Sequence, residues 1–270
     1  NYQYVHLALL SGSSLPSDLW VPSSSEIKPK FSTQYGIGYF KNLKDNMYET
    51  SIEAYYKEMT NLIEYKEGVL PEDNTNSNSD GAFTFGNGDS YGLELLIKKT
   101  KGNTTGWIGY TLSKTTRYFD EVNDGIAFPA KYDRRHDLSI TAKHKLSEKW
   151  TLSSVFVYAT GNAITLPTER YMVGGNIYTE YTSRNGFRME PYHRLDIGAT
   201  YTPKKKKRFQ SSWSFSIYNI YSRKNPYFIY FALESTEGQE GSIQNGNLTP
   251  KAYQVSIFPI LPSVTWNFNF

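Results

Sequence analysis

The amino-acid sequence predicts an all-β fold, namely an antiparallel transmembrane β-barrel of which about ten strands are present. Three observations lead to this prediction. Aromatic residues make up 16% of the 270 residues, with 23 Tyr, yet the mean hydropathy is −0.55. Apolar and polar residues alternate along the chain, and long connections alternate with short ones. Aromatic girdles outside and a wet lumen inside are typical of such barrels.

The strands are predicted from apolar residues spaced two apart, because successive side chains of a strand point to opposite faces. At the C-terminus the apolar set is Val264, Trp266, Phe268 and Phe270, and the polar set is Thr265, Asn267 and Asn269. Earlier apolar sets are Phe31, Tyr35, Ile37 and Tyr39; Leu138, Ile140 and Ala142; Leu195, Ile197, Ala199 and Tyr201; and Trp213, Phe215 and Ile217. Strands are therefore expected near 2–10, 30–41, 47–59, 89–99, 105–117, 134–145, 150–160, 191–202, 210–221 and 251–270.

The connections between these strands differ in length in a regular order. Short ones are expected at 42–46, 101–104, 147–149 and 203–208, and long ones at 11–29, 61–90, 119–133, 161–191 and 222–250. Short periplasmic turns and longer extracellular loops distinguish outer-membrane barrels. The order places the end of the last strand, Phe270, at the periplasmic side. It also places the basic run 204–208 in a periplasmic turn, which we interpret as a solvated hairpin.

The last predicted strand contains a change of parity. Its apolar set begins as Tyr253, Val255 and Ile257 but ends on Val264 and the aromatic residues that follow. A β-bulge within 258–262 would produce this change, since one extra residue reverses the facing of all later residues. The alternative is a turn and an eleventh strand. A single bulged strand agrees better with the order of the connections.

The face opposite the apolar sets carries small and charged residues, and this face would line the lumen. Cross-strand pairs in a small closed barrel or water in a wide lumen could satisfy the charges, and the small residues favour part of a larger barrel. The small residues are Gly36, Gly38, Gly109, Ser139 and Gly198, and the charged ones are Glu49, Glu53, Lys57, Glu94, Lys98, Asp137, Lys143, Arg194 and Asp196.

The composition and the spacing of polar residues argue against several function classes. Cysteine is absent, and a net charge of +3 gives no indication of nucleic acid as a partner. The four His residues do not share a strand face at metal-ligand spacing, so neither a metal nor a cofactor is expected. His136 and Asp137 are adjacent on a strand and face opposite ways, so they cannot form a dyad. We expect no catalytic residues, and we expect Arg134 and Arg135 to pair with lumen carboxylates.

Several segments, taken in order, resemble the C-terminal half of the β-barrel of TonB-dependent outer-membrane receptors. The resemblance is to the branch that carries a carboxypeptidase-regulatory-like N-terminal domain. It implies a roughly 22-stranded barrel with a plugged lumen, of which this chain would be the last ten strands. Residues 1–270 would then be one part of a single domain, without the plug and the first half of the barrel. The segments are PSDLW at 16–20, QYGIGYF at 34–40, EAYYK at 53–57, FPAKYDRRHD at 128–137, YATGNA at 158–163, NPY at 225–227 and PSVTWNFNF at 262–270.

The resemblance also implies a function, a location in the cell outer membrane and a set of partners. The protein would import a ligand captured by its long extracellular loops, and that ligand could be a small molecule, a peptide or a glycan. Partners would be outer-membrane lipid and the TonB complex acting through the plug, with a surface lipoprotein as a further candidate. The loop aromatics that we expect to bind ligand are Tyr171, Tyr178, Tyr181, Tyr227, Phe228 and Tyr230. The alternatives are a small complete barrel that acts as a protease or lipase, and a structural or adhesive barrel.

The terminal aromatic residues Trp266, Phe268 and Phe270 have two interpretations. A C-terminal Phe after alternating aromatics resembles the signal that the barrel-assembly machinery reads. The same residues would also face lipid as part of an aromatic girdle. Both roles can hold at once.

Overall fold

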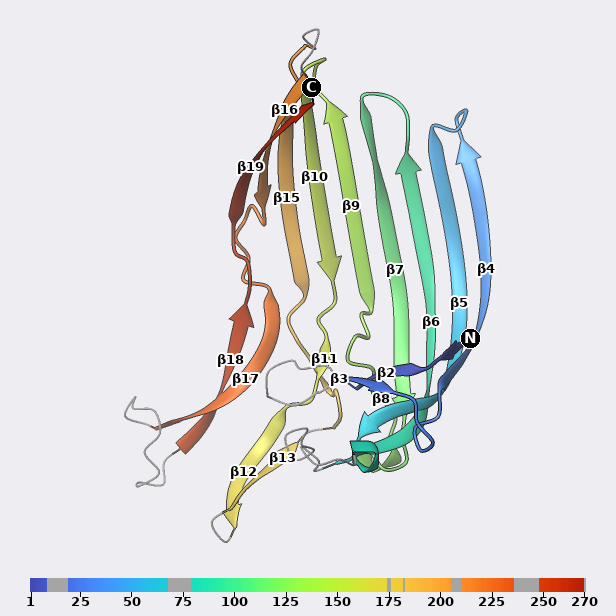
Figure 1. Cartoon of the computed structure of the whole chain (residues 1–270), viewed down its shortest axis with the longest axis vertical. Helices are drawn as coiled ribbons and strands as arrows, with labels where there is room; N and C mark the ends of the chain where they lie inside the picture. The colour runs from blue at the N-terminus through green and yellow to red at the C-terminus, as the bar shows by residue number, and fades with distance from the viewer. Residues whose placement is uncertain are drawn as a thin grey trace.

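The computed structural model describes residues 1–8, 19–67, 79–173, 176–181, 183–204, 210–235 and 248–269 (Figure 1). A continuous antiparallel wall dominates this part of the chain. Its sheet follows the order β1-β4-β5-β6-β7-β9-β10-β15-β16-β19. These strands are β1 (Tyr2–Gln3), β4 (Lys30–Leu43), β5 (Tyr48–Tyr65), β6 (Phe83–Lys99), β7 (Thr104–Tyr118), β9 (His136–Lys145), β10 (Trp150–Ala159), β15 (Tyr192–Tyr201), β16 (Gln210–Tyr218) and β19 (Leu261–Asn269).

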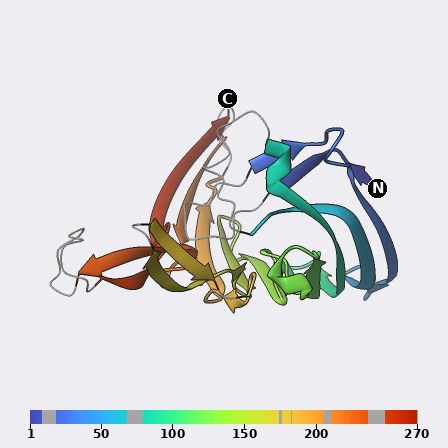
Figure 2. The same cartoon turned by 90° about the horizontal axis from the view of Figure 1, so that it is seen from below.

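The short connections lie together at one end of the wall, as the sequence predicted. Three of them, at 44–47, 100–103 and 146–149, join successive long strands, and the connection from β15 to β16 lies partly outside the described residues. Figure 1 shows these three at the end of the wall where β19 ends, with the described parts of the long connections at the opposite end. Seen along the strands, the wall is an open arc (Figure 2). The expected all-β antiparallel architecture is confirmed.

The register of the sheet separates an apolar face from a polar one. Trp150, Tyr201, Trp213 and Trp266 are neighbours in one register row on the apolar face. A row on the other face contains Glu53, Glu94 and Asp137. All the small and charged residues that we expected to line the lumen have the parity of this polar face. The apolar face is therefore the one that suits lipid.

The N-terminal segment differs from the single strand expected at 2–10. Only β1 pairs with the wall, and the chain then forms β2 (Val5–Ala8), which pairs with β3 (Leu19–Pro22). The reason is a local core at the long-connection end of the wall. This core consists of Ala8, Val21, Ile27, Ile63, Tyr65, Ala82 and Phe83. A strand in the wall could not bury Ala8 and Val21 in this way.

The C-terminal segment is two strands rather than the one bulged strand expected at 251–270. β18 (Leu248–Ser256) pairs with β17 (Pro226–Ser235), whereas β19 pairs with β16. The break lies at 257–260, where Phe258 has a φ of 55°. Both strands run in the same direction in Figure 1, so the chain does not turn back. The parity change therefore marks a switch from one sheet to another.

The remaining elements lie among the long connections. They are the 3₁₀ turns η2 (Ser79–Ala82) and η3 (Asn123–Gly125), and the short strands β8 (Phe128–Pro129), β11 (Ala163–Ile164), β12 (Pro167–Val173), β13 (Asn176–Tyr181) and β14 (Phe187–Arg188). A second small core of Leu62, Phe119, Val122 and Phe128 packs beneath them. Within the described ranges, no helix is both long and apolar enough to cross a membrane.

Candidate functional site

Two hairpins project from the long-connection end of the wall, opposite the short turns (Figure 1). One is β12–β13, in which Tyr171 lies opposite Tyr178 and Tyr181 lies opposite Pro167. The side chains of these three tyrosines lie outside the described residues. The structure establishes only the backbone pairing of this hairpin. The contribution of these tyrosines to ligand binding therefore stays a prediction.

The second hairpin, β17–β18, carries a connected set of aromatic rings. Tyr230 stacks on Tyr253 across the hairpin, with ring centroids 5.3 Å apart. Phe228 lies 6.2 Å from Tyr230 and has the same parity, and Tyr227 packs edge-on against Phe228 at 5.7 Å. Tyr227 and Tyr230 remain exposed. We call Phe228, Tyr230 and Tyr253 the hairpin aromatic face.

Two buried asparagines hold the segment that leads from the wall into this hairpin. Asn219 donates its backbone N–H to Asp196 at 2.8 Å and its amide to the Arg223 carbonyl at 2.9 Å. Asn225 accepts the His193 backbone N–H and donates to the His193 carbonyl, both at 3.0 Å. Asn219 has a φ of 52°, a left-handed conformation that Asn tolerates better than most residues. The start of the hairpin is thereby fixed to β15.

A polar cluster faces the lumen at the same place. The Arg194 guanidinium lies 4.1 Å from the centre of the Tyr218 ring, and Nη1 donates to the hydroxyl oxygens of Tyr218 at 2.7 Å and Tyr192 at 2.9 Å. Asp196 lies 2.9 Å from Arg194 Nε. The sequence pointed to Arg194 and Asp196 as lumen charges but missed the two tyrosines. Their position on the polar face of neighbouring strands was the signal that could have found them.

The base of the central loops is organised around Asp133, whose side chain is 1% exposed. Its carboxylate accepts the Thr115 backbone N–H at 2.7 Å and binds the Arg188 guanidinium. Arg135 lies 3.5 Å from the same carboxylate. Arg188 also donates to the Asp133 carbonyl and, at 3.3 Å, to the Gly161 carbonyl. One carboxylate thus connects two loops and a wall strand.

The expected pairing of the two neighbouring arginines is correct for one of them. Arg134 lies 3.8 Å from Asp137, which belongs to the polar lumen row. Arg135 instead pairs with Asp133, which is buried in the loop base rather than in the lumen. The reason is that the chain turns before β9 begins at His136, so Arg135 does not yet follow the strand alternation.

A second ionic contact joins the central loops to the end of β5. Arg184 Nη2 donates to Glu64 at 3.1 Å and to the Tyr65 carbonyl at 3.2 Å. Its backbone N–H donates to the side chain of Asn123 at 2.9 Å. Both charged side chains are largely buried, with exposed fractions of 18% and 6%. This ion pair joins residues 120 positions apart and therefore holds the loops against the end of the wall.

The histidines of the wall bind hydroxyl groups. Tyr110 bonds to Nδ1 of His136, Thr104 to Nδ1 of His144 and Tyr221 to Nδ1 of His193, each at 2.8 Å. His136 and Asp137 lie in different register rows on opposite faces. Across the ranges that the structure covers, no three His, Asp or Glu residues gather as metal ligands.

The terminal aromatic residues lie on the apolar face beside the short turns. Trp266 is opposite Trp213, and the two rings are nearly parallel at 5.6 Å. Trp266 also lies 4.8 Å from Phe268. Phe270 lies outside the described residues. The two described residues extend a row of rings that begins with Trp150 and Tyr201, whose centroids are 5.0 Å apart.

Comparisons with known proteins agree with this architecture. Residues 10–220 match the family described as TonB dependent receptor-like, beta-barrel. No curated protein matches the sequence. Similar solved structures include the ferric-catecholate import receptor Fiu of Escherichia coli K12, with 13% identity, a TM-score of 0.52 and coverage of 91% of this chain and 29% of that one.

Two further structures are similar to the same extent. FpvA of Pseudomonas aeruginosa, bound to heterologous pyoverdines, has 17% identity and a TM-score of 0.53, with coverage of 90% of this chain and 28% of that one. The outer membrane transporter YddB of Escherichia coli has 11% identity and a TM-score of 0.54, with coverage of 92% and 34%. The chain therefore spans about a third or less of the length of these structures.

The antiparallel wall with short turns at one end and long loops at the other defines the class as outer-membrane β-barrels. Within that class, the chain belongs to the TonB-dependent receptor β-barrel family, because the family match covers most of its length. Members of this family are receptors and transporters rather than enzymes.

Proposed function

We propose that this chain supplies a wall segment and ligand-capturing loops of an outer-membrane receptor that imports a small ligand. The observation that carries the proposal is the hairpin aromatic face, which projects beyond the wall at the end opposite the short turns. A set of half-buried to exposed rings at the extracellular end is suited to bind a ligand before it enters the lumen. The Arg194 cluster lies at the root of the same hairpin and faces the lumen.

The wall needs further strands to act in this way. Among the described residues, β19 pairs only with β16, and β4 pairs on its outer side only with the two residues of β1. An unpaired strand edge in hydrocarbon costs several kcal/mol for each unsatisfied backbone group. We therefore propose that residues 1–270 are one part of a larger barrel domain. That domain would include a plug through which the TonB complex supplies energy, and the barrel-assembly machinery would insert it.

We further propose that the ligand carries a flat ring, because stacked aromatic side chains bind such faces well. Two of the similar structures are described as a ferric-catecholate import receptor and as a receptor bound to pyoverdines. A catecholate offers a ring of this kind and negative charge that Arg194 could attract. Peptides with aromatic side chains and glycans offer similar faces and are the competing ligand classes.

The test uses the full-length receptor in cells whose growth requires import of a ferric tris-catecholate. Replacing Phe228 and Tyr230 together by Ala should weaken the apparent affinity about tenfold, since two ring contacts are lost. The matched control is Tyr4→Ala, an exposed tyrosine 65% accessible and outside the hairpin. Growth should also require the energy-coupling complex.

Three results would each contradict one part of the proposal. Unchanged uptake by the double variant would exclude the hairpin aromatic face as the capture surface. Uptake that persists without the energy-coupling complex would exclude import of the TonB-dependent kind. If the wild type binds an aromatic peptide or a glycan but not the catecholate, the ring-bearing catecholate is the wrong ligand class.

A further inference from the structure

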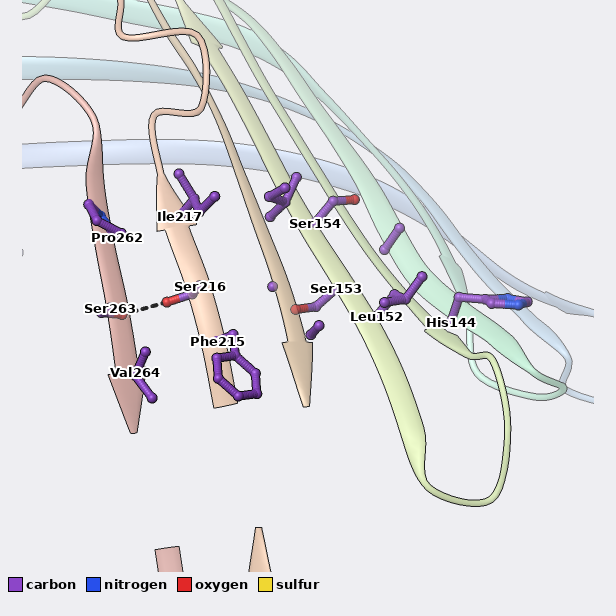
Figure 3. A pocket seen from close by; sticks show the side chains of 14 residues that line it. His144, Leu152, Ser153, Ser154, Phe215, Ser216, Ile217, Pro262, Ser263 and Val264 are labelled. Carbon is purple, nitrogen blue, oxygen red and sulfur yellow. Dashed lines mark hydrogen bonds between the residues drawn. The ribbon is translucent and has the colours of Figure 1, made fainter. Parts of the chain in front are cut away.

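The apolar face of the wall contains a hollow of about 610 Å³ near the short turns. Side chains from β9, β10, β15, β16 and β19 line it (Figure 3). Ten of its 14 lining residues have the parity of the apolar face. The other four, Ser153, Gly198, Ser216 and Ser263, have the parity of the polar face. The hollow therefore opens toward lipid rather than toward the lumen.

Small side chains create the hollow. Ala142 lies opposite Ser154, and Ala199 lies opposite Leu152 on the next pair of strands. Larger apolar side chains surround this floor, among them Phe215 and others that are partly exposed. Such a depression in an apolar surface matches a hydrocarbon chain, and each buried methylene is favourable.

The position of the hollow indicates which kind of molecule would fill it. The register row next to it on the turn side contains Trp150, Tyr201, Trp213 and Trp266. Tryptophan and tyrosine lie at the level of lipid headgroups. The hollow thus begins where acyl chains begin, in the leaflet beside the short, periplasmic turns.

Polar groups at the turn end of the hollow favour an anionic headgroup. His144 lines the hollow two residues before the connection at 146–149 and bonds through Nδ1 to the Thr104 hydroxyl at 2.8 Å. When Nδ1 accepts that proton, Nε2 carries the ring proton and can donate to a phosphate. Lys149 and Lys204 are exposed in the two connections beside the hollow, and Glu148 is the only acidic residue in the sequence of these connections.

We propose that this hollow is a binding site for one anionic phospholipid of the periplasmic leaflet. One acyl chain occupies the floor formed by Ala142, Ser154 and Ala199. The phosphate lies at His144 and the lysines of the neighbouring turns, where each cation near an anionic lipid surface contributes favourably. The site is separate from the loops that capture ligand, and it does not depend on the identity of that ligand.

The experiment is native mass spectrometry of the full-length receptor titrated with dioleoyl phosphatidylglycerol or dioleoyl phosphatidylcholine. Filling the hollow by Ala199→Phe, or independently by Ala142→Leu from another strand, should weaken phosphatidylglycerol binding about tenfold. Replacing Lys149 by Ser together with His144→Ala should weaken it about threefold. The matched control is Ala54→Phe, which enlarges an alanine of the same apolar face on β5, outside the hollow.

Heat-modifiable migration on gels first establishes that each variant is assembled. Binding of one phosphatidylglycerol by the wild type and by Ala54→Phe, but not by the filled variants, supports the proposal. Equal binding by filled and wild-type proteins would overturn it. Equal binding of phosphatidylcholine would overturn the headgroup assignment. A dimer that disappears when the hollow is filled would show that a second copy occupies this surface instead.

Discussion

The buried carboxylate of Asp133 allows a quantitative test of how the loops are held. Arg188→Met removes the guanidinium but keeps an unbranched side chain of similar reach. It leaves a carboxylate that is 1% exposed, whose partners among the described residues are then the Thr115 N–H at 2.7 Å and Arg135 at 3.5 Å. Breaking a buried pair from one side costs about 3–5 kcal/mol. Because the Arg188 side chain is 30% exposed, we reduce this to about 2–3 kcal/mol.

The reverse substitution should cost less. Asp133→Asn keeps an oxygen for the Thr115 N–H, and the guanidinium that it leaves behind can be hydrated. We expect about 1–2 kcal/mol. Arg188→Met should cost more than Asp133→Asn because Asp133, with 1% of its side chain exposed, is more deeply buried than Arg188, with 30%. The double variant should cost less than the sum, because each single variant already removes the shared contact.

Amide hydrogen exchange of the full-length receptor in lipid nanodiscs measures these energies as local opening. In Arg188→Met, the backbone amides of residues 130–133, which follow β8, and those of β14 should exchange about 30- to 150-fold faster. This range corresponds to a loss of about 2–3 kcal/mol, because each 1.4 kcal/mol is about a factor of ten. Amides in the middle of β9 and β10 serve as internal controls. Unchanged exchange at the loop base, or strictly additive effects in the double variant, would refute the reasoning.

Three further predictions concern other parts of the chain. Gly106 has a φ of 155°, and an added Cβ would lie 2.1 Å from a carbonyl oxygen of β9. Gly106→Ala should therefore destabilise the barrel by about 1–3 kcal/mol in urea melts. The control Gly81→Ala should not destabilise it, because the space around Gly81 is open. Burial lowers the pKa of His6, so the folded state favours the neutral ring. The amides of β2 and β3 should therefore lose protection against hydrogen exchange, corrected for intrinsic rates, as the pH falls below about 6.5. Protection that does not depend on pH would contradict this. Trp266→Ala with Phe270→Ala should lower the amount of heat-modifiable barrel in outer membranes, and an unchanged band would exclude an assembly role.

Much of the wall was predictable because its information is local. Alternation such as that of Leu138, Ile140 and Ala142 follows from strand geometry alone, and the register then places Leu138 opposite Tyr158 and Ile140 opposite Phe156 on β10. The order of short and long connections likewise needs no tertiary information. The lumen-facing parity of Arg194 and Asp196 was available for the same reason.

The candidate site was predictable only in part. Phe228 and Tyr230 stand out in the sequence as loop aromatics, but the stacking of Tyr230 on Tyr253 depends on β17 pairing with β18. From the sequence, these two segments are expected to be a loop and the start of the last wall strand. The lipid-facing hollow could not be predicted from the sequence either. It depends on which small residues of five strands become neighbours, and that is set by register rather than by spacing along the chain.

By itself, the sequence determined that this protein is a two-faced antiparallel wall with turns at one end and loops at the other, because alternation and loop length are properties of consecutive residues. Only the tertiary structure decided how the loops are held. The contacts of Asp133 with Arg188 and of Glu64 with Arg184 join residues 55 and 120 positions apart. No periodic pattern marks such pairs, since they form only when folded strands bring distant loops into one buried, low-dielectric place.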